Sequence, residues 1–373
     1  MRTKPTFVIV ATERRSKLAR VMPAPELHDL ACVIHLHSTY SDGTGTVPEI
    51  AAAARANALD AVLLTDHDTL EAKRRGEEGY HEGVLVLVGE EVSPRARDHL
   101  LAFGPDQHVR HRGRTAAEVS RRVHAAGGIA FAAHPFSRGS TLVKRPAAMP
   151  YSDLDGAELT GIELWSFVTD SVEAIARWRD VAAFVARPER FVDHPPERNL
   201  AEWDRLCRDR RVVAIGGLDA HQIGVRVLGR VPLKLMSYRR SFSFLRTHVL
   251  CERAPTGVLE HDREAIFGAL REGRCYLAMD SLEPARGFSF WGERAGELVA
   301  MGAQAPAAAV TLRVRAPRPA ALRLLRDGEL LASRDGDELE QRVEGAGVYR
   351  VEARLEAGGR ERTWIVSNPI YLR

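Results

Sequence analysis

The feature that most constrains this chain is a short apolar run that recurs and closes each time in residues able to bind a metal ion. A lone histidine at the end of a strand is more often structural than a ligand, but repeated strand ends of this kind favour a shared site. The pattern therefore predicts a polynuclear metal centre. The residues that close the runs are His35, His37, Asp66, His67, Asp68, Glu91, His134, Asp219 and His221.

The first run also indicates how two ligands reach one ion. Alternate side chains of a β-strand lie on the same face. His35 and His37 are therefore expected to point together toward the ion, while Ile34 and Leu36 pack the other way.

Helical segments alternate with these strands. Thr46 to Glu49 and Thr115 to Glu118 match the capping box that begins many helices, and a last helix is expected near Asp262–Gly273. Such alternation predicts parallel strands joined by helical crossovers, and ligands at strand carboxyl ends predict an α/β barrel with its site on that face. The further strands expected are Val84–Val88, Gly128–Ala133, Gly161–Trp165 and Val212–Gly216.

Four segments are expected along the chain: an N-terminal extension at 1–30, a barrel at 31–283, an insertion within it at about 138–210, and a small C-terminal β-sandwich at 284–373. Met22 is an alternative start, which would leave the basic leader mostly disordered. The insertion carries charged, Trp-bearing helical runs around Ser171–Phe184 and Asn199–Arg210. The sandwich is expected from short alternating strands at Val310–Val314, Ala321–Leu325 and Val348–Ala353, with turns at Asp327-Gly328 and Asp335-Gly336.

Composition excludes several classes of function. The formal charge of +3 on 373 residues offers no basic stripe, so a stable nucleic-acid complex is not expected. The cysteines are scattered without zinc-site spacing, which favours a reducing, cytoplasmic location. The leader lacks a signal-peptide core, and no apolar stretch is long enough to span a membrane.

Taken together, the motifs resemble the PHP (polymerase and histidinol phosphatase) superfamily over about residues 31–283. The resemblance implies a distorted, TIM-like (β/α)7 barrel with two or three divalent ions of zinc, manganese or iron. The tail from Trp364 to Tyr371 is similar to the C-terminal module of the CehA/McbA-type branch of metallohydrolases. The matching motifs are His35-x-His37 with Ser41-Asp42-Gly43, Thr65-Asp66-His67, Gly89-Glu90-Glu91-Val92-Ser93, His99, Ala133-His134-Pro135 and Asp219-Ala220-His221.

Carried over by position, the resemblance implies three ion sites, with Glu91 as the bridge between the first two. The ligands would be His35, His37, Glu91 and Asp219 for the first ion, Glu91, His99 and His134 for the second, and Asp42, His67 and His221 for the third. Glu90 competes for the bridging role. Glu91 is preferred because Gly-x-Glu followed by a small apolar residue and Ser is the family's pattern.

The activity implied by the resemblance is hydrolysis of phosphate esters, either phosphomonoesters or small nucleotides, by a hydroxide that bridges two ions. Hydrolysis of a carbamate, carboxylic ester or amide is the alternative, because the same hydroxide can attack a carbonyl. Exonuclease action is disfavoured, since the chain has no polymerase region and no basic track for a strand. A non-catalytic binding protein that only stores metal is the alternative outside enzymes. The expected partner is a small phosphorylated molecule, and homo-oligomer formation is open.

Three residues are candidates for catalysis: Glu91 as the bridging ligand, Asp68 as a proton donor, and Arg138. Arg138 lies four positions after His134 and is a candidate for a bidentate clamp on a phosphoryl oxygen, assisted by Lys144; an exposed loop cation is the alternative interpretation. Asp66 and Asp68 are expected to orient His67 or its neighbours.

Other polar and aromatic residues carry weaker signals. Phe136 and Trp165 fit a substrate pocket or core packing equally well. The remaining histidines are expected at the surface; they are His28, His81, His108, His111, His124, His194, His248 and His261.

Overall fold

The computed structural model describes residues 23–94, 97–140, 142, 149–222, 224–227, 231–234 and 236–373. The leader before residue 23, with the proposed start at Met22, lies outside the described residues, as does Lys144.

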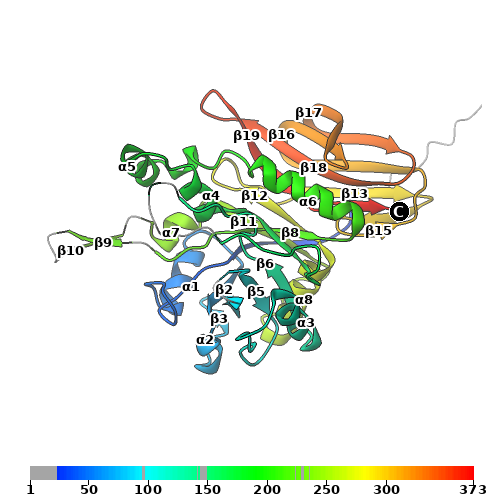
Figure 1. The fold of residues 1–373 in the computed structure, drawn as a ribbon. Helices are drawn as coiled ribbons and strands as arrows, with labels where there is room; N and C mark the ends of the chain where they lie inside the picture. Colours follow the sequence, from blue (N-terminus) through cyan, green and yellow to red (C-terminus); the bar gives the residue numbers. More distant parts are fainter. Residues whose placement is uncertain are drawn as a thin grey trace, which may run out of the picture.

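A ring of strands forms the larger part of the molecule (Figure 1). Pairing runs in the order β1, β2, β4, β5, β6, β7, β8. Just beyond β8 the chain returns to β1: Leu36 bridges Ala220 in parallel, and the His37 N–H donates to the Ala220 carbonyl at 3.0 Å. The ring strands are β1 (His28–Ile34), β2 (Ala61–His67), β4 (Val84–Val92), β5 (Leu100–Phe103), β6 (Ile129–Ala132), β7 (Gly161–Ser166) and β8 (Val213–Gly217).

One ring strand departs from the expected parallel arrangement. β5 runs antiparallel to both of its neighbours, β4 and β6. The reason is the short connection after Val92, because a parallel crossover needs a dozen or more residues. The amino end of β5 consequently lies at the same edge as the carboxyl ends of the parallel strands. His99 stands at this edge although it precedes a strand.

The helices begin where the capping signals predict. Thr46 caps α1, with its hydroxyl accepting from the Glu49 N–H at 3.4 Å, and Thr115 caps α3 in the same way. Gly273, with φ of 75°, closes α8 in the left-handed conformation. The helices are α1 (Val47–Arg55), α2 (Glu71–Arg74), α3 (Ala116–Ala125), α4 (Phe167–Glu173), α5 (Trp178–Ala186), α6 (Glu197–Asp209), α7 (Tyr238–Ser241) and α8 (Leu259–Glu272), with a 3-10 turn at Pro188–Arg190.

Two apolar layers follow from the alternation of residues along the ring strands. Residues such as Ile34, Leu63 and Leu87 share one buried cluster with Phe267 and Leu270 of α8. The residues next to them in the sequence, such as Val33, Leu64 and Val86, face the other way and pack in a second cluster with α1, α3 and α6. We call the cluster with α8 the inner cluster and the one with α1, α3 and α6 the outer cluster. Because alternate strand residues share a face, the polar residues that follow the inner-cluster residues at the carboxyl ends of the strands are expected to lie on the inner face too.

The C-terminal region is antiparallel β-structure, as expected. Its strands are β13 (Ser289–Arg294), β14 (Glu297–Ala300), β15 (Gln304–Ala305), β16 (Val310–Arg326), β17 (Glu329–Val343), β18 (Gly347–Glu356), β19 (Glu361–Ser367) and β20 (Ile370–Leu372). β15 alone pairs in parallel, with β20. The segments expected as two strands at 310–314 and 321–325 form one strand, β16.

One of the two expected turns is wrong. Asp327-Gly328 does join β16 to β17, but Asp335-Gly336 lies inside β17. Gly336 adopts φ of 147° beside an irregularity where the pairing skips from Arg315 to Ala320. A glycine inside a strand often marks such a bulge, so the Asp335-Gly336 pair marks an irregular pairing here and not a turn.

The C-terminal strands pair with the sheet that precedes them, through β19, and the division at residue 284 stays a prediction. β12 (Cys275–Met279) pairs with β11 (Leu245–Cys251) on one side and with β19 on the other. Asn368 is fully buried and bonds to the backbone of Ala214 in β8 and of Cys275 in β12. These buried hydrogen bonds connect the two regions.

The expectation that His248 lies at the surface is wrong. It is fully buried in β11, with Nδ1 2.7 Å from Asp29 and Nε2 3.3 Å from Asp280. The carboxylates come from β1 and from the end of β12, so the burial depends on distant strands. The four cysteines are free and buried, as expected of small apolar residues.

The remaining strands are β3 (Gly79–His81), which pairs with β4, and a hairpin of β9 (Gly224–Val227) and β10 (Val231–Lys234). Among the described residues, no helix is both long and apolar enough to cross a membrane.

Candidate metal centre

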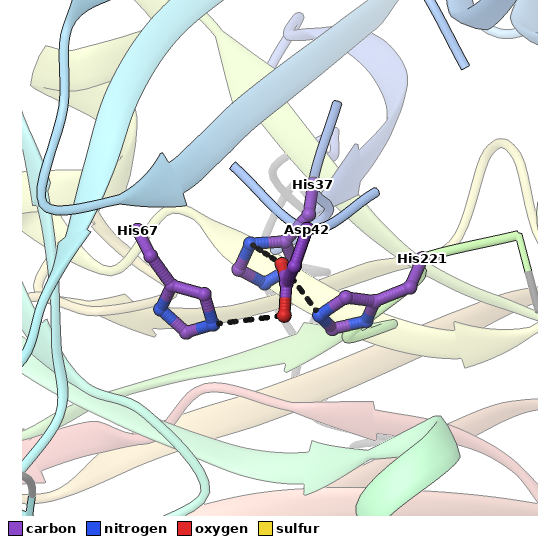
Figure 2. Close-up of side chains that lie close together, drawn as sticks. All are labelled: His37, Asp42, His67 and His221. Atoms are coloured by element: carbon purple, nitrogen blue, oxygen red, sulfur yellow. Dashed lines mark ion pairs between the residues drawn. The ribbon is translucent and has the colours of Figure 1, made fainter. Parts of the chain in front are cut away.

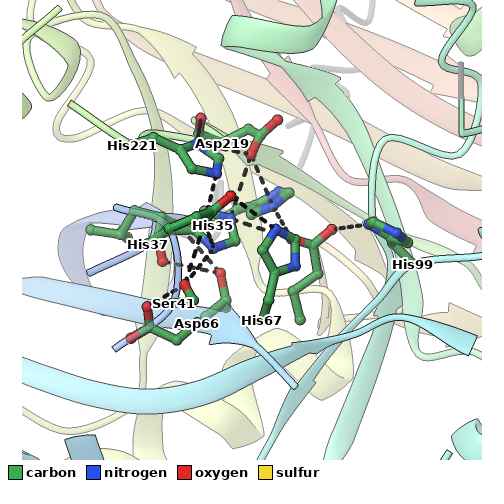
Figure 3. A network of polar contacts seen from close by, with 12 residues as sticks. His35, His37, Ser41, Asp66, His67, His99, Asp219 and His221 are labelled. Carbon is green, nitrogen blue, oxygen red and sulfur yellow. Dashed lines mark hydrogen bonds and ion pairs between the residues drawn. The ribbon is translucent and has the colours of Figure 1, made fainter. Parts of the chain in front are cut away.

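The expected ligands gather at the carboxyl edge of the ring (Figure 3). Within each of three groups the ligand atoms lie within 4.8 Å of one another. His134 joins them through its contact with Glu91, 3.2 Å away. The groups are His35, His37, Glu91 and Asp219; His67, Glu91 and His99; and His37, Asp42, His67 and His221. These sets overlap the three expected ion sites, although His37 and His67 are each close to two of them.

Glu91, the last but one residue of β4, is at the centre. It is fully buried, and its two oxygens face different histidines. Oε2 lies 3.2 Å from His35 Nε2, 3.3 Å from His37 Nε2 and 3.3 Å from His67 Nδ1, while Oε1 lies 2.7 Å from His99 Nδ1 and 3.2 Å from His134 Nε2. This is the placement that a bridging carboxylate requires.

The structure also decides between the two glutamates. Glu90 points to the opposite side of β4, where its oxygens accept from His108 Nδ1 at 2.6 Å and from the Val109 N–H at 2.8 Å. The alternation of the strand therefore places Glu91, and not Glu90, against the expected ligands.

The outer group surrounds Asp42, as Figure 2 shows. Asp42 Oδ1 is 3.2 Å from His221 Nε2 and 3.7 Å from His37 Nδ1, and Oδ2 is 3.8 Å from His67 Nε2. Burial disfavours the charged forms, but the contact with His221 outweighs it: the pKa of Asp42 falls to about 2 and that of His221 rises to about 9. The Asp42 side chain is 57% exposed, so this group faces solvent while Glu91 does not.

The backbone has a positive φ angle at three expected ligands and at Asp68. The φ angles are 64° at His35, 29° at His134, 50° at Asp219 and 51° at Asp68. Non-glycine residues rarely adopt this conformation, and such strain gathers at functional sites. At His35 the reversal ends β1 at Ile34, so the two histidines reach one site through a bend and not through the straight strand expected from alternation.

The donor set fits divalent cations. Burial lowers the pKa of His35, but the carboxylates of Glu163, Glu91 and Asp219 raise it further, to well above its usual value. Burial likewise raises the pKa values of Glu91 and Asp219, but the facing imidazoles hold both well below their usual range. His37 Nε2 is buried without a hydrogen-bond partner among the described residues. An imidazole nitrogen that lies 3.3 Å from Glu91 and 3.5 Å from Asp219 is the arrangement that a metal ion would complete.

Asp66 holds the loop that carries two ligands. Its carboxylate accepts from the Ser38 N–H at 2.7 Å, from the Ser38 hydroxyl at 2.6 Å and from the Ser41 hydroxyl at 2.6 Å (Figure 3). The Tyr238 hydroxyl of α7 donates to the His37 carbonyl at 2.6 Å. Asp66 thus orients the neighbours of the ligands, while the anchoring role of Tyr238 had no signal in the sequence.

Asp68 and Arg138 differ in exposure and in their contacts. Asp68 follows the ligand His67; its side chain is partly exposed and accepts from the Ser93 N–H at 2.8 Å. Arg138 is exposed, and its N–H donates to Glu173 at 2.6 Å. Within the described residues the Arg138 guanidinium makes no bond to the ligands.

The two aromatic candidates for a substrate pocket, Phe136 and Trp165, differ in how deeply they are buried. Trp165 is fully buried in the outer apolar cluster and so serves packing, whereas Phe136 is only partly buried against that cluster.

One residue that sequence reasoning missed touches the ligands directly. Glu163 is buried in β7 with its carboxylate 3.0 Å from His35 Nδ1. The available signal was a charged residue inside the buried run Gly161–Ser166, because a buried charge needs a partner.

Comparison with known proteins agrees with the motifs. Residues 34–127 match the PHP domain family. The resemblance is confirmed for that segment, which holds His35, His37, Asp42, His67, Glu91 and His99. No curated protein matches the chain. The likeness of the tail to the CehA/McbA-type module stays a prediction.

Three solved structures are similar to this chain. A two-domain protein from Bacteroides vulgatus, described as containing a PHP-like metal-dependent phosphoesterase, has 15% identity over 93% of this chain and 97% of its own, with a TM-score of 0.44. A metal-dependent phosphoesterase from Bifidobacterium adolescentis has 20% identity over 51% and 87%, with a TM-score of 0.35. An amidohydrolase from Chromobacterium violaceum with bound sulfate and no metal has 20% identity over 51% and 87%, with a TM-score of 0.30.

Proposed function

We propose that this protein is a hydrolase of phosphate esters that depends on divalent metal ions. The observation that carries the proposal is the fully buried carboxylate of Glu91 within 3.3 Å of nitrogens from five histidines. A structural carboxylate rarely needs so many imidazole partners, whereas a bridging ligand between ions does. The PHP domain match over residues 34–127 supports the same assignment.

The ligands would divide among two inner positions and one outer position. His35, His37, Glu91 and Asp219 would hold the first ion; Glu91, His99 and His134 the second; and Asp42, His67 and His221 the third. When bound, two neighbouring ions lower the pKa of a shared water and stabilise negative charge on a phosphoryl oxygen. Zinc, manganese and iron all suit imidazole with carboxylate.

The surrounding residues would supply positioning and a proton. Asp68 is the proposed donor to the leaving oxygen, because it directly follows His67 and keeps a partly exposed carboxyl. The N–H of Ser93 holds that carboxyl in place. Arg138 is the proposed phosphate clamp, since it follows His134 in the loop after β6 and its guanidinium has no ion-pair partner among the described residues. The partner would be a small phosphorylated molecule.

The competing function, hydrolysis of a carbamate, ester or amide, would use the same ligands. A direct experiment separates the two. The protein is purified without chelator, its metal content is measured, and phosphomonoesters, phosphodiesters and aryl carbamates are screened with Mn²⁺, Fe²⁺ and Zn²⁺ added separately. We expect phosphate release that chelator removes and one of these ions restores. Release of phenol from carbamates with no phosphate from any ester would overturn the proposal.

A further inference from the structure

Glu163 is a second carboxylate, after Glu91, that bonds to residues assigned to both inner ions. Its Oε2 lies 3.0 Å from His35 Nδ1, and its Oε1 lies 3.1 Å from the same nitrogen. Oε2 also accepts from the backbone N–H of His134 at 2.7 Å. His35 is assigned to the first ion and His134 to the second. The Glu163 side chain therefore contacts one proposed ligand residue of each inner ion.

The fold leaves room for this carboxylate at one specific place. A Cβ atom on Gly217, at the end of β8, would lie 1.9 Å from Glu163 Oε1 and 3.1 Å from the His35 Cβ. Any side chain at position 217 would therefore displace either Glu163 or His35. A glycine on the neighbouring strand is thus an independent sign that the contact between Glu163 and His35 is built into the ring.

We propose that Glu163 is a positioning residue that sets the tautomer and orientation of His35 and ties it to the His134 backbone. The inference rests on the proposed metal-dependent function. Accepting the proton of His35 Nδ1 leaves Nε2 with a free lone pair, and Nε2 is the nitrogen that faces Glu91 at 3.2 Å and Asp219 at 3.5 Å. Carboxylate partners of this kind orient metal-binding imidazoles and increase their basicity.

The chemistry of Glu163→Gln shows why a carboxylate is needed. His35 Nδ1–H lies within 3.1 Å of both oxygens of Glu163, and the His134 N–H donates to Oε2. A glutamine has one oxygen, and its amide nitrogen would meet a donor. His35 can relieve that conflict by moving its proton to Nε2, which then cannot bind a metal ion. The substitution therefore removes one ligand without changing any ligand residue.

Three variants of the full chain test the inference. Glu163→Gln alters the hydrogen-bond acceptor, and Gly217→Ala displaces the Glu163 side chain from the neighbouring strand β8. Ser166→Ala is the matched control, because Ser166 is buried on the same strand and its hydroxyl has no hydrogen-bond partner in the described structure. Each protein is stripped with chelator, its melting temperature is measured, and Mn²⁺ alone is titrated by calorimetry, followed by Zn²⁺ in competition with a chelator.

We expect Glu163→Gln to weaken metal binding by roughly 10–100-fold, the loss typical when the partner of a metal-bound histidine is removed. Gly217→Ala should weaken it in the same direction, and Ser166→Ala should match wild type. A folded Glu163→Gln protein that binds Mn²⁺ and Zn²⁺ as tightly as wild type overturns the inference. A lower melting temperature with unchanged metal affinity also overturns it, since Glu163 would then be only structural. Wild type that binds neither ion contradicts the proposed function itself.

Discussion

The buried ion pair between Asp204 and Arg350 offers a quantitative test of how the C-terminal region is attached. Asp204 is in α6, within the helical insertion, and Arg350 is in β18; the two elements pack together in Figure 1. The guanidinium bonds both carboxylate oxygens, at 2.8 and 2.9 Å, and also bonds Glu352 at 2.7 Å. Its side chain is 3% exposed, and that of Asp204 is 8% exposed.

Arg350→Met should destabilise the protein strongly. The methionine fills part of the space but leaves the Asp204 carboxylate buried without its bidentate partner. Breaking one side of a buried pair costs about 3–5 kcal/mol of the free energy of unfolding. At about 2–4 °C per kcal/mol, a scale set by somewhat smaller domains, the melting temperature should fall by roughly 6–20 °C.

The assay is thermal and urea unfolding followed by circular dichroism, with two companion variants. Arg315→Met removes an exposed arginine that pairs with Glu338, and should cost about 0–1 kcal/mol. The double variant Asp204→Leu with Arg350→Met should recover most of the loss, because no buried charge is left unpaired at that contact. If Arg350→Met behaves like Arg315→Met, the contact does not hold the two regions together and the reasoning is refuted.

Three further results are expected. Glu91→Gln should abolish turnover and reduce bound metal, because it removes the shared charged ligand; full metal content with full activity would contradict the site. Arg138→Ala should lower kcat/KM for phosphomonoesters by roughly tenfold or more and leave a neutral aryl carbamate unchanged, as for a charge-assisted contact; equal effects on both substrates would argue against the clamp. His248→Gln should flatten the dependence of the unfolding free energy on pH. Burial opposes the charged imidazole, but Asp280 and Asp29 raise the pKa of His248, so its stabilisation is full below the ordinary value of 6.5 and is lost as pH rises through the folded pKa. Urea titrations at several pH values measure this, and wild-type stability that does not fall at high pH would count against it.

The sequence by itself predicts the chemistry of the centre. Ligand types are read from residue identity, and the family's Gly-x-Glu pattern favoured Glu91, the glutamate that lies against the histidines, over Glu90. The capping boxes at Thr46 and Thr115 placed two helix starts, because those signals lie within four consecutive residues. Local rules succeeded wherever the deciding atoms are close in sequence.

Long-range contacts decided the rest. The direction of β5 depends on which neighbour it meets, and this places His99 at the ligand edge. The burial of His248 depends on Asp29, far away in the chain. The pairing of β12 with β19 joins residues 276–278 to residues 365–367. No periodicity in a single segment encodes such pairings, since they are set by the packing of whole layers.

Glu163 shows the limit most clearly. Its sequence neighbours mark it only as a charge inside a buried strand, whereas its partner His35 is 128 residues away. The space it occupies is left by a glycine on a third segment, Gly217. The chain thus specified which side chains can bind metal, and the tertiary structure decided which carboxylate orients them, because that choice depends on three strands meeting at one edge.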